Sequence, residues 1–315
     1  MKLLISRRLP ERNMAAACER FDVTCRDTTL PMTHDECVAA LSDHDIIVPT
    51  LGDAFRAEAF AAVPAPRARL LANFGAGYNH IDVAAASAAG LAVTNTPGAV
   101  TDATADIALT LILMTARRAG EGERMVRADR WTGWHPTQML GLHVSGKTVA
   151  VIGMGRIGQA IARRCHFGFG CRIVYVNRSA KSVDFPAEQM EMEAALSAAD
   201  IVVLATPGGA DTHHLMGAEA FAAMQPHAIF VNISRGDVVD ETALIAALEA
   251  GRIAGAGLDV YEFEPKVPAA LKAMENVTLL PHLGTAALEA REAMAAMALD
   301  NCIAHAEGRP LPNPV

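Results

Sequence analysis

Short apolar runs rich in β-branched residues alternate with alanine-rich segments of helical period along the whole 315-residue chain. This alternation predicts β-α-β units, which build parallel sheets flanked by helices. The expected strands are residues 2–6, 45–49, 69–73, 91–94, 148–152, 172–176, 201–205, 228–233, 255–260 and 277–280. At roughly 150 residues per domain the length favours two domains. The sequence therefore predicts an α/β protein with two domains.

Two predicted helices stand out. Residues 103–118 are unusually apolar, so this helix should be buried on several faces, as a connector between lobes or a helix against another subunit would be. Pro97 and Gly98 precede it and are a candidate lobe boundary. A final helix over residues 285–306 leads into a tail with three prolines, which cannot continue it.

The composition excludes several classes of protein. The 27 basic and 35 acidic residues give a net charge of −8, which disfavours a general binder of nucleic acid or of an anionic membrane. The longest apolar stretch, residues 107–116, is well short of the roughly 20 residues that a membrane crossing needs. The first residues do not resemble a secretory signal. We therefore expect a cytoplasmic protein.

Cysteine and histidine spacing does not indicate a metal. The six cysteines include no C-x-x-C pair and are expected to be reduced thiols. His213 and His214 are adjacent, but neighbouring side chains are expected to point in different directions, and no H-E-x-x-H or i, i+4 pair accompanies them. No metal site is predicted.

Gly153, Gly155 and Gly158 have the G-x-G-x-x-G spacing directly after an expected strand and before a plausible helix. In this context the glycines permit a tight turn, close approach of the backbone to a pyrophosphate and close packing of helix on strand. The helix N-terminus adds partial positive charge. Strand, turn, helix and second strand together predict a dinucleotide site.

The residue expected beside the adenosine ribose is Asn177, where an NAD site usually has an acid. Arg178 and Ser179 follow it and offer a guanidinium and a hydroxyl to a 2′-phosphate. NADP(H) is therefore the favoured cofactor. The alternative is that Arg178 is a solvated loop residue and that the site also accepts NAD(H).

Three further segments lie where strands of such a sheet should end, namely residues 231–237, 257–265 and 280–285. Together with residues 73–82 they closely resemble the D-isomer-specific 2-hydroxyacid dehydrogenases. The resemblance implies a Rossmann-type doubly wound parallel sheet, residues 97–286, inserted into a smaller flavodoxin-like α/β substrate lobe, residues 1–96 and 287–315. It also implies a homodimer.

The resemblance makes His282 the proton donor, Glu264 its carboxylate partner and Arg235 the group that binds the substrate carboxylate. The chemistry agrees, because reduction of a 2-oxo acid needs an acid that changes protonation near neutral pH. Arginine offers paired donors to an anion and stays charged. Glu262 is a rival two residues away, on the same face if the segment is extended. The family pattern, which ends in Glu-Pro, selects Glu264.

The resemblance also implies the remaining site residues. Leu51, Ala76 and Gly77 should contact substrate, together with Arg235 and His282. Asp259 could instead be a turn carboxylate, and Thr104 a helix-start hydroxyl. The expected cofactor contacts are Thr104, Gly153, Gly155, Arg156, Ile157, Gly158, Asn177, Arg178, Ser179, Thr206, Pro207, Ile233, Ser234, Asp259 and Gly284.

Residues 101–106, 153–158 and 177–179 most resemble glyoxylate and hydroxypyruvate reductases. We therefore expect NADPH-dependent reduction of glyoxylate to glycolate and of hydroxypyruvate to D-glycerate. Phosphite dehydrogenases of the family have a lysine where Ala76 stands, which disfavours that chemistry. A D-lactate-type or broad 2-oxo acid dehydrogenase using NAD is an alternative. A cofactor-sensing scaffold like the corepressors of this fold is another, because fold does not fix function.

Overall fold

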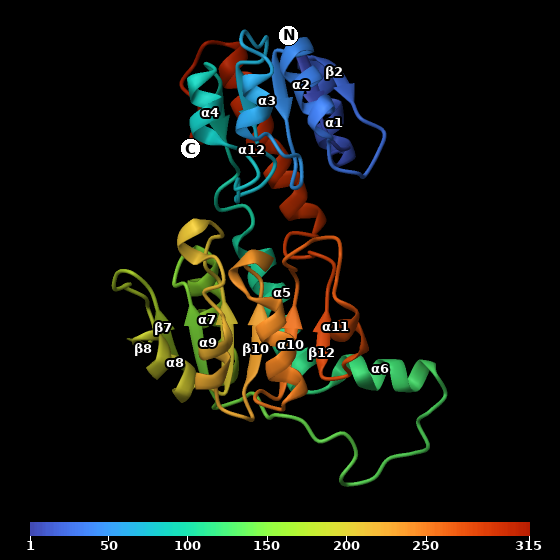
Figure 1. Cartoon of the computed structure of the whole chain (residues 1–315), viewed down its shortest axis with the longest axis vertical. Helices are drawn as coiled ribbons and strands as arrows, with labels where there is room; N and C mark the ends of the chain where they lie inside the picture. The colour runs from blue at the N-terminus through green and yellow to red at the C-terminus, as the bar shows by residue number, and fades with distance from the viewer. The chain divides into compact units, whose positions relative to one another are not determined.

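The computed structural model describes residues 1–315, which form two compact units (Figure 1). The first unit comprises residues 1–100 and 285–315, and the second comprises residues 101–284. The chain therefore leaves the first unit once, after residue 100, and returns to it once, at residue 285. Each unit has its own parallel sheet.

The first unit contains a five-stranded sheet in the order β2-β1-β3-β4-β5, in which every pair is parallel. This is the flavodoxin-like doubly wound order. Its helix α12 packs on α1 and against β4. The elements are β1 (Lys2–Ile5), α1 (Glu11–Arg20), β2 (Asp22–Cys25), α2 (His34–Asp43), β3 (Ile46–Val48), α3 (Ala57–Ala61), β4 (Leu70–Ala72), α4 (Val83–Ala88), β5 (Ala92–Thr94) and α12 (Leu288–Ala306).

The second unit contains a seven-stranded parallel sheet in the order β12-β11-β10-β9-β6-β7-β8. The order reverses between β6 and β9, and doubly wound sheets bind ligands at the carboxyl ends of strands beside such a reversal. The elements are α5 (Thr101–Ala116), α6 (Ala119–Arg127), β6 (Thr148–Ile152), α7 (Arg156–Phe169), β7 (Arg172–Val176), β8 (Ala187–Gln189), α8 (Met192–Ala198), β9 (Ile201–Leu204), η1 (Ala210–Thr212), α9 (Ala218–Ala223), β10 (Ile229–Asn232), η2 (Gly236–Val238), α10 (Glu241–Glu249), β11 (Gly255–Leu258), α11 (Ala269–Ala273) and β12 (Val277–Leu279).

Alternate residues of the central strands supply the cores on the two faces of this sheet. Ala150 and Ile152 of β6 pack into one core with residues of α8, α9 and α10. Val149 and Val151 pack into the other with residues of α5 and α7. Because both faces are covered, these strands read as continuous apolar runs in the sequence.

Three expectations differ from the structure in detail. The helix expected over residues 103–118 ends at Ala116, because Arg118 has a left-handed φ of 53° and a separate helix, α6, follows. α5 packs on α7, β10 and β11 within the second unit. The final helix begins at Leu288 and not at Thr285, since residues 285–287 form a turn. The strands β2 and β8 were not predicted.

No helix of the structure is both long enough and apolar enough to cross a membrane. All six cysteines are free thiols, and four of them are buried. Burial raises the pKa of Cys37, Cys165 and Cys302 to about 12, so these thiols are unreactive at neutral pH.

Candidate active site

Arg235 follows the carboxyl end of β10, and the side chain of Asn232 shapes the turn that carries it. Asn232 Oδ1 accepts hydrogen bonds from the Ser234 backbone N–H and hydroxyl, at 2.9 and 2.8 Å. Asn232 Nδ2 donates to the Arg235 carbonyl at 3.1 Å. Asn232 is buried and was not singled out in the sequence, although a buried polar residue at a strand end is a usable signal.

The Arg235 guanidinium has unused donors. Its Nη1 donates to the Ser234 carbonyl at 2.7 Å, and it forms no ion pair. Burial lowers the pKa of Arg235, and the negative charges of Glu264 and Asp237 partly oppose this shift. A mostly buried, unpaired guanidinium is suited to binding an anion.

Gly236 brings Arg235 against the segment that follows β11. A Cβ at position 236 would collide with the backbone of Tyr261 and Glu262. The close approach places Arg235 next to the segment that carries Glu264, whose charge influences the guanidinium. Glycine is required here by this contact and not by its φ.

Glu264 and His282 are hydrogen-bonded, with Glu264 Oε2 2.8 Å from His282 Nδ1. Glu264 Oε1 accepts from the Tyr261 backbone N–H at 3.1 Å. Burial disfavours the charged carboxylate, but the hydrogen bond from His282, the Tyr261 N–H and the charges of His282 and Arg235 outweigh it. The pKa of Glu264 is therefore below its usual value. Glu264 is a carboxylate acceptor at neutral pH.

Asp259 fixes the segment that carries His282. Its carboxylate accepts from the backbone N–H groups of Leu283 and Gly284 at 2.6 and 2.8 Å, and its carbonyl accepts from the His282 N–H at 2.9 Å. Burial raises the pKa of Asp259, although these N–H groups and His282 oppose the shift. These contacts favour the alternative of a turn carboxylate. His282 itself has a left-handed φ of 55°.

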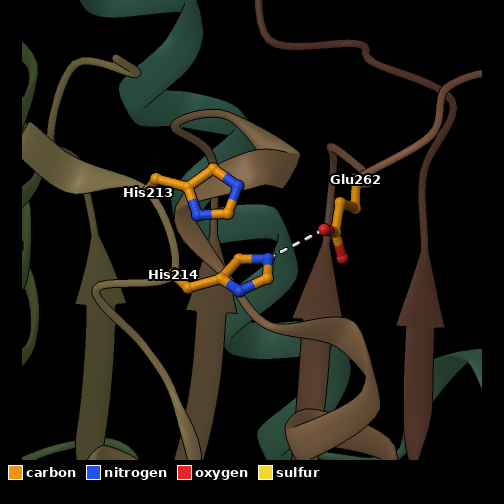
Figure 2. Close-up of side chains that lie close together, drawn as sticks. All are labelled: His213, His214 and Glu262. Atoms are coloured by element: carbon orange, nitrogen blue, oxygen red, sulfur yellow. Dashed lines mark hydrogen bonds and ion pairs between the residues drawn. The ribbon is translucent and has the colours of Figure 1, made fainter. Parts of the chain in front are cut away.

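Glu262, the rival to Glu264, has other partners. Its Oε1 lies 2.8 Å from Nε2 of His214 (Figure 2), and its backbone N–H donates to Glu241 Oε1 at 3.1 Å. The structure therefore places Glu264, and not Glu262, beside the His282 ring.

The glycine turn has the shape that a dinucleotide needs. Gly153 has a φ of 100°, and a Cβ there would lie 2.8 Å from Ala205 and Thr206. A Cβ at Gly158 would collide with the Gly153 carbonyl, whereas one at Gly155 would meet nothing within 4 Å. Gly155 also caps α7, whose first residues are Arg156 and Ile157. The open space before a helix N-terminus fits a pyrophosphate.

Several other expected cofactor residues lie in segments that follow further strands of the same sheet. Oγ1 of Thr206 is buried without a hydrogen-bond partner, so a donor or acceptor for a ligand is present beside Gly153. Pro207 and Ile233 follow the neighbouring strands β9 and β10. A Cβ at Gly284 would lie within 3.6 Å of Thr104 and Asp259, so the structure brings these three residues together. These observations fit a nicotinamide dinucleotide.

The loop after β7 contains the expected ribose residues. Asn177 Oδ1 accepts from the Met154 N–H at 3.1 Å, and its Nδ2 donates to the Ser179 carbonyl at 2.8 Å. Asn177 thus ties the loop to the glycine turn. The side chains of Arg178 and Ser179 are exposed and have no partner. No carboxylate pairs with Arg178, so its guanidinium is free.

In the first unit, Asn73 shapes the turn that contains Ala76 and Gly77. Its Nδ2 donates to the carbonyls of Gly75 and Gly77 at 3.0 and 3.1 Å, and its Oδ1 lies 3.0 Å from Nε2 of His80. These carbonyls are held inside the turn, and Ala76 and Gly77 remain half-exposed.

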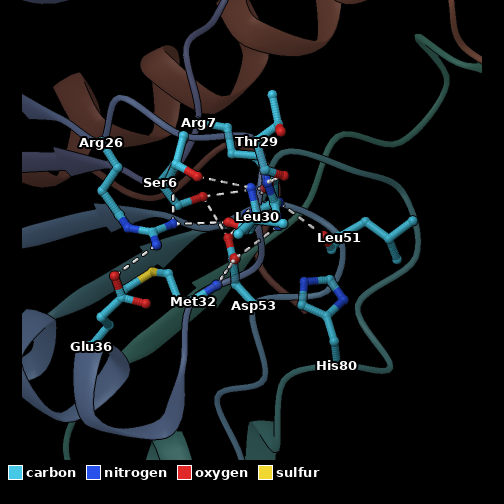
Figure 3. Close-up of polar contacts among 12 residues, drawn as sticks. Ser6, Arg7, Arg26, Thr29, Leu30, Met32, Glu36, Leu51, Asp53 and His80 are labelled. Carbon is cyan, nitrogen blue, oxygen red and sulfur yellow. Dashed lines mark hydrogen bonds and ion pairs between the residues drawn. The ribbon is translucent and has the colours of Figure 1, made fainter. Parts of the chain in front are cut away.

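Leu51 lies in a loop held by the buried Asp53 (Figure 3). The Asp53 carboxylate accepts from the backbone N–H groups of Thr50 and Met32 at 2.7 and 2.9 Å and pairs with Arg7 at 3.3 Å. Arg7 Nη1 donates to the Leu51 carbonyl at 2.9 Å. The Leu51 side chain is 40% exposed. Neither Asp53 nor Arg7 was predicted.

The chain is similar to known proteins over nearly its whole length. The profile of the D-isomer specific 2-hydroxyacid dehydrogenase NAD binding domain matches residues 109–284. The chain is 42% identical over 314 residues to the glyoxylate reductase of Thermococcus onnurineus, covering 98% of this chain and 93% of that one. It is 40% identical over 305 residues to glyoxylate/hydroxypyruvate reductase B of Cronobacter sakazakii, covering 96% and 93%.

A similar solved structure is the NADPH-dependent glyoxylate/hydroxypyruvate reductase of Sinorhizobium meliloti, in complex with NADP and malonate. Its sequence is 34% identical, its TM-score is 0.89, and the match covers 100% of this chain and 96% of that one.

Proposed function

The chain belongs to the D-isomer-specific 2-hydroxyacid dehydrogenase family, and we propose that it uses NADPH to reduce glyoxylate to glycolate and hydroxypyruvate to D-glycerate. The observation that carries this proposal is the arrangement within the second unit. His282 is hydrogen-bonded to Glu264, and the guanidinium of Arg235 has no ion pair. These residues offer one proton donor and one anion-binding group. Reduction of a 2-oxo acid needs both, because the carbonyl oxygen must be protonated and the carboxylate must be bound.

The turn of Gly153, Gly155 and Gly158 would hold a nicotinamide dinucleotide, which when bound would supply the hydride for the carbonyl carbon. Arg235 binds the substrate carboxylate with its free donors and polarises the carbonyl. His282 gives the proton on Nε2 to the carbonyl oxygen, which completes the alcohol, and solvent then returns a proton to the ring. Glu264 stabilises the charged imidazolium through Nδ1.

Residues of the first unit are proposed to bind the substrate and to limit its size. The backbone N–H groups of Ala76 and Gly77 bind the substrate carboxylate, since small residues allow close approach there. Leu51 limits the size of the substrate, and the network around Asp53 supports its loop.

The preference for NADPH rests on the loop after β7. Asn177 is occupied with the glycine turn, which leaves Arg178 and Ser179 as the groups free to bind a 2′-phosphate. The Sinorhizobium meliloti relative, which is NADPH-dependent, supports the same choice.

We further propose a cytoplasmic homodimer. All six thiols are free, which fits a reducing compartment. The segment after α6 exposes Trp131, Trp134 and Leu140 by 53, 78 and 67%, and large exposed apolar side chains of this kind are typical of subunit contacts. Light scattering during size-exclusion chromatography tests the dimer, and a monomer at micromolar concentration would refute it.

The function is tested by initial rates of NADPH and NADH oxidation with glyoxylate, hydroxypyruvate, pyruvate and phenylpyruvate. We expect the highest kcat/KM with NADPH and the first two acids. Preference for NADH would refute the cofactor assignment alone, and preference for pyruvate would favour a D-lactate-type or broad dehydrogenase. Tight cofactor binding without turnover of any acid would indicate a scaffold.

A further inference from the structure

A second group of chemically active side chains lies in the second unit, apart from the Glu264 and His282 pair. Ring nitrogens of His213 and His214 and a carboxylate oxygen of Glu262 all lie within 4.8 Å of one another (Figure 2). We propose that these three side chains bind a late first-row divalent cation, with Zn²⁺ as the best fit. This site is additional to the proposed reductase function and does not depend on it.

The backbone explains how two neighbouring histidines contribute to one site. His214 has a left-handed φ of 50°, so the alternation expected of an extended segment does not apply. The two rings lie 4.0 Å apart between centroids, on the same side of the chain. The expectation that the two side chains point in different directions was therefore wrong.

The loop is fixed on both sides of the histidine pair. The His214 N–H donates to the Asp237 carbonyl at 2.9 Å, and the Met216 N–H donates to the Val238 carbonyl at 3.0 Å. Before the pair, the Thr212 hydroxyl donates to the Pro207 carbonyl at 2.8 Å. A strained non-glycine residue held by such contacts is a feature of binding sites.

Glu262 is held by reciprocal contacts with Glu241. The Glu262 N–H donates to Glu241 Oε1 at 3.1 Å, and the Glu241 N–H donates to Glu262 Oε2 at 3.4 Å. Glu262 Oε1 is thereby aimed at His214.

Two imidazole nitrogens and one carboxylate oxygen are a usual zinc donor set, with a fourth position left for water. Bonds of about 2.0–2.1 Å in a tetrahedron put neighbouring donors roughly 3.3 Å apart. Metal binding therefore requires His214 Nε2 and Glu262 Oε1, which are 2.8 Å apart, to separate slightly. It also requires the His213 ring to rotate toward these two atoms. His213 is exposed and makes no hydrogen bond, so its ring is free to turn.

The test is a titration of protein without a histidine tag, in a Cys18→Ser background because Cys18 is an exposed thiol. Co²⁺ is added at pH 7.5 while its visible d–d absorption is recorded, and Zn²⁺ affinity is then measured against a chromophoric chelator. We expect one equivalent of metal. Even changes outside the ligand set typically cost roughly 10- to 100-fold in affinity, so His213→Ala and His214→Ala should each lose at least that.

Matched variants separate this site from other histidines. His213→Ala removes no hydrogen bond, so its fold should be intact by circular dichroism. His227→Ala, which removes an exposed histidine paired with Asp200, should bind metal like the parent, as should His282→Ala. Absence of Co²⁺ uptake, or uptake retained in both His213→Ala and His214→Ala, would overturn the proposal and leave His214 and Glu262 as a hydrogen-bonded pair only.

Discussion

His282 Nδ1 lies 2.8 Å from Oε2 of Glu264, and this contact determines which ring nitrogen is available for chemistry. The pKa of Glu264 is below its usual value, so the carboxylate is ionised at neutral pH and can only accept. Nδ1 is therefore the donor to Glu264, and Nε2 is the nitrogen free to exchange a proton with substrate. Asp259 holds the backbone beside the ring, because its carboxylate accepts from the N–H groups of Leu283 and Gly284.

We predict that His282→Ala reduces kcat with glyoxylate by about 10²- to 10⁴-fold, the usual contribution of a positioned general acid. NADPH affinity, measured by quenching of protein fluorescence, should not change. His227→Ala is the control and should have the kcat of the parent. A near-normal kcat in His282→Ala would remove this residue from the acid role.

Glu264→Gln should change how stability depends on pH. The pKa of Glu264 is lowered on folding, so its ionised form stabilises the protein above the ordinary glutamate pKa of about 4.3, and this stabilisation is lost as the pH falls. The side chains of Glu264 and His282 are each about 30% exposed. We therefore expect Glu264→Gln to lower the free energy of unfolding by on the order of 1 kcal/mol at pH 7.

The measurement is urea unfolding of the parent and Glu264→Gln between pH 7 and pH 3. The difference in free energy of unfolding should be present above the ordinary glutamate pKa of about 4.3 and should shrink as the pH falls below it, through the lowered pKa of Glu264. Glu249→Gln, which changes an exposed residue without an ion pair, should follow the parent throughout. A difference that grows toward acid pH would contradict the assigned direction of the shift.

The central strands were predictable because both of their faces are buried. β6, for example, supplies one core through Ala150 and Ile152 and the other through Val149 and Val151, so its sequence is uniformly apolar. The edge strands β2 and β8 lack this signal, since their residues are exposed or only partly buried. Their pairing depends on neighbours that local sequence does not reveal.

Residues of the candidate site could be predicted from the sequence where their own side chains have a role in the proposed reaction. Arg235, Glu264 and His282 stand at strand ends in recognisable segments. Positioning residues such as Asn232, Asn73 and Asp53 were missed, because their hydrogen bonds form only once the turns are folded. The histidine pair was misjudged for a related reason, since the left-handed φ of His214 cannot be read from its neighbours.

Arg178→Ala should raise the KM for NADPH and leave the KM for NADH unchanged. A hydrogen bond to a charged group is typically worth about 1.5–3 kcal/mol, so the increase should be roughly tenfold or more. Steady-state kinetics with both cofactors check this. Arg172→Ala, which removes an exposed arginine paired with Glu188, is the matched control. An equal effect on both cofactors would mean that the 2′-phosphate is bound elsewhere.

Gly236→Ala should impair stability and activity together. The new Cβ would collide with the backbone of Tyr261 and Glu262, which cannot move without displacing Glu264. Overpacking of this kind typically costs about 1–3 kcal/mol. We expect a lower Tm and, below that Tm, a lower kcat/KM for glyoxylate, because Arg235 and Glu264 are pushed apart.

Gly168→Ala provides the comparison, because a Cβ at that position in α7 meets no atom within 4 Å. Alanine is favoured over glycine in a helix by roughly 0.5–1 kcal/mol, so this variant should be as stable as the parent or more stable, with unchanged kinetics. If Gly236→Ala matched Gly168→Ala in both Tm and kcat/KM, the contact between Gly236 and Tyr261 would not be what positions Arg235. A lower Tm with normal kcat/KM would limit its role to folding.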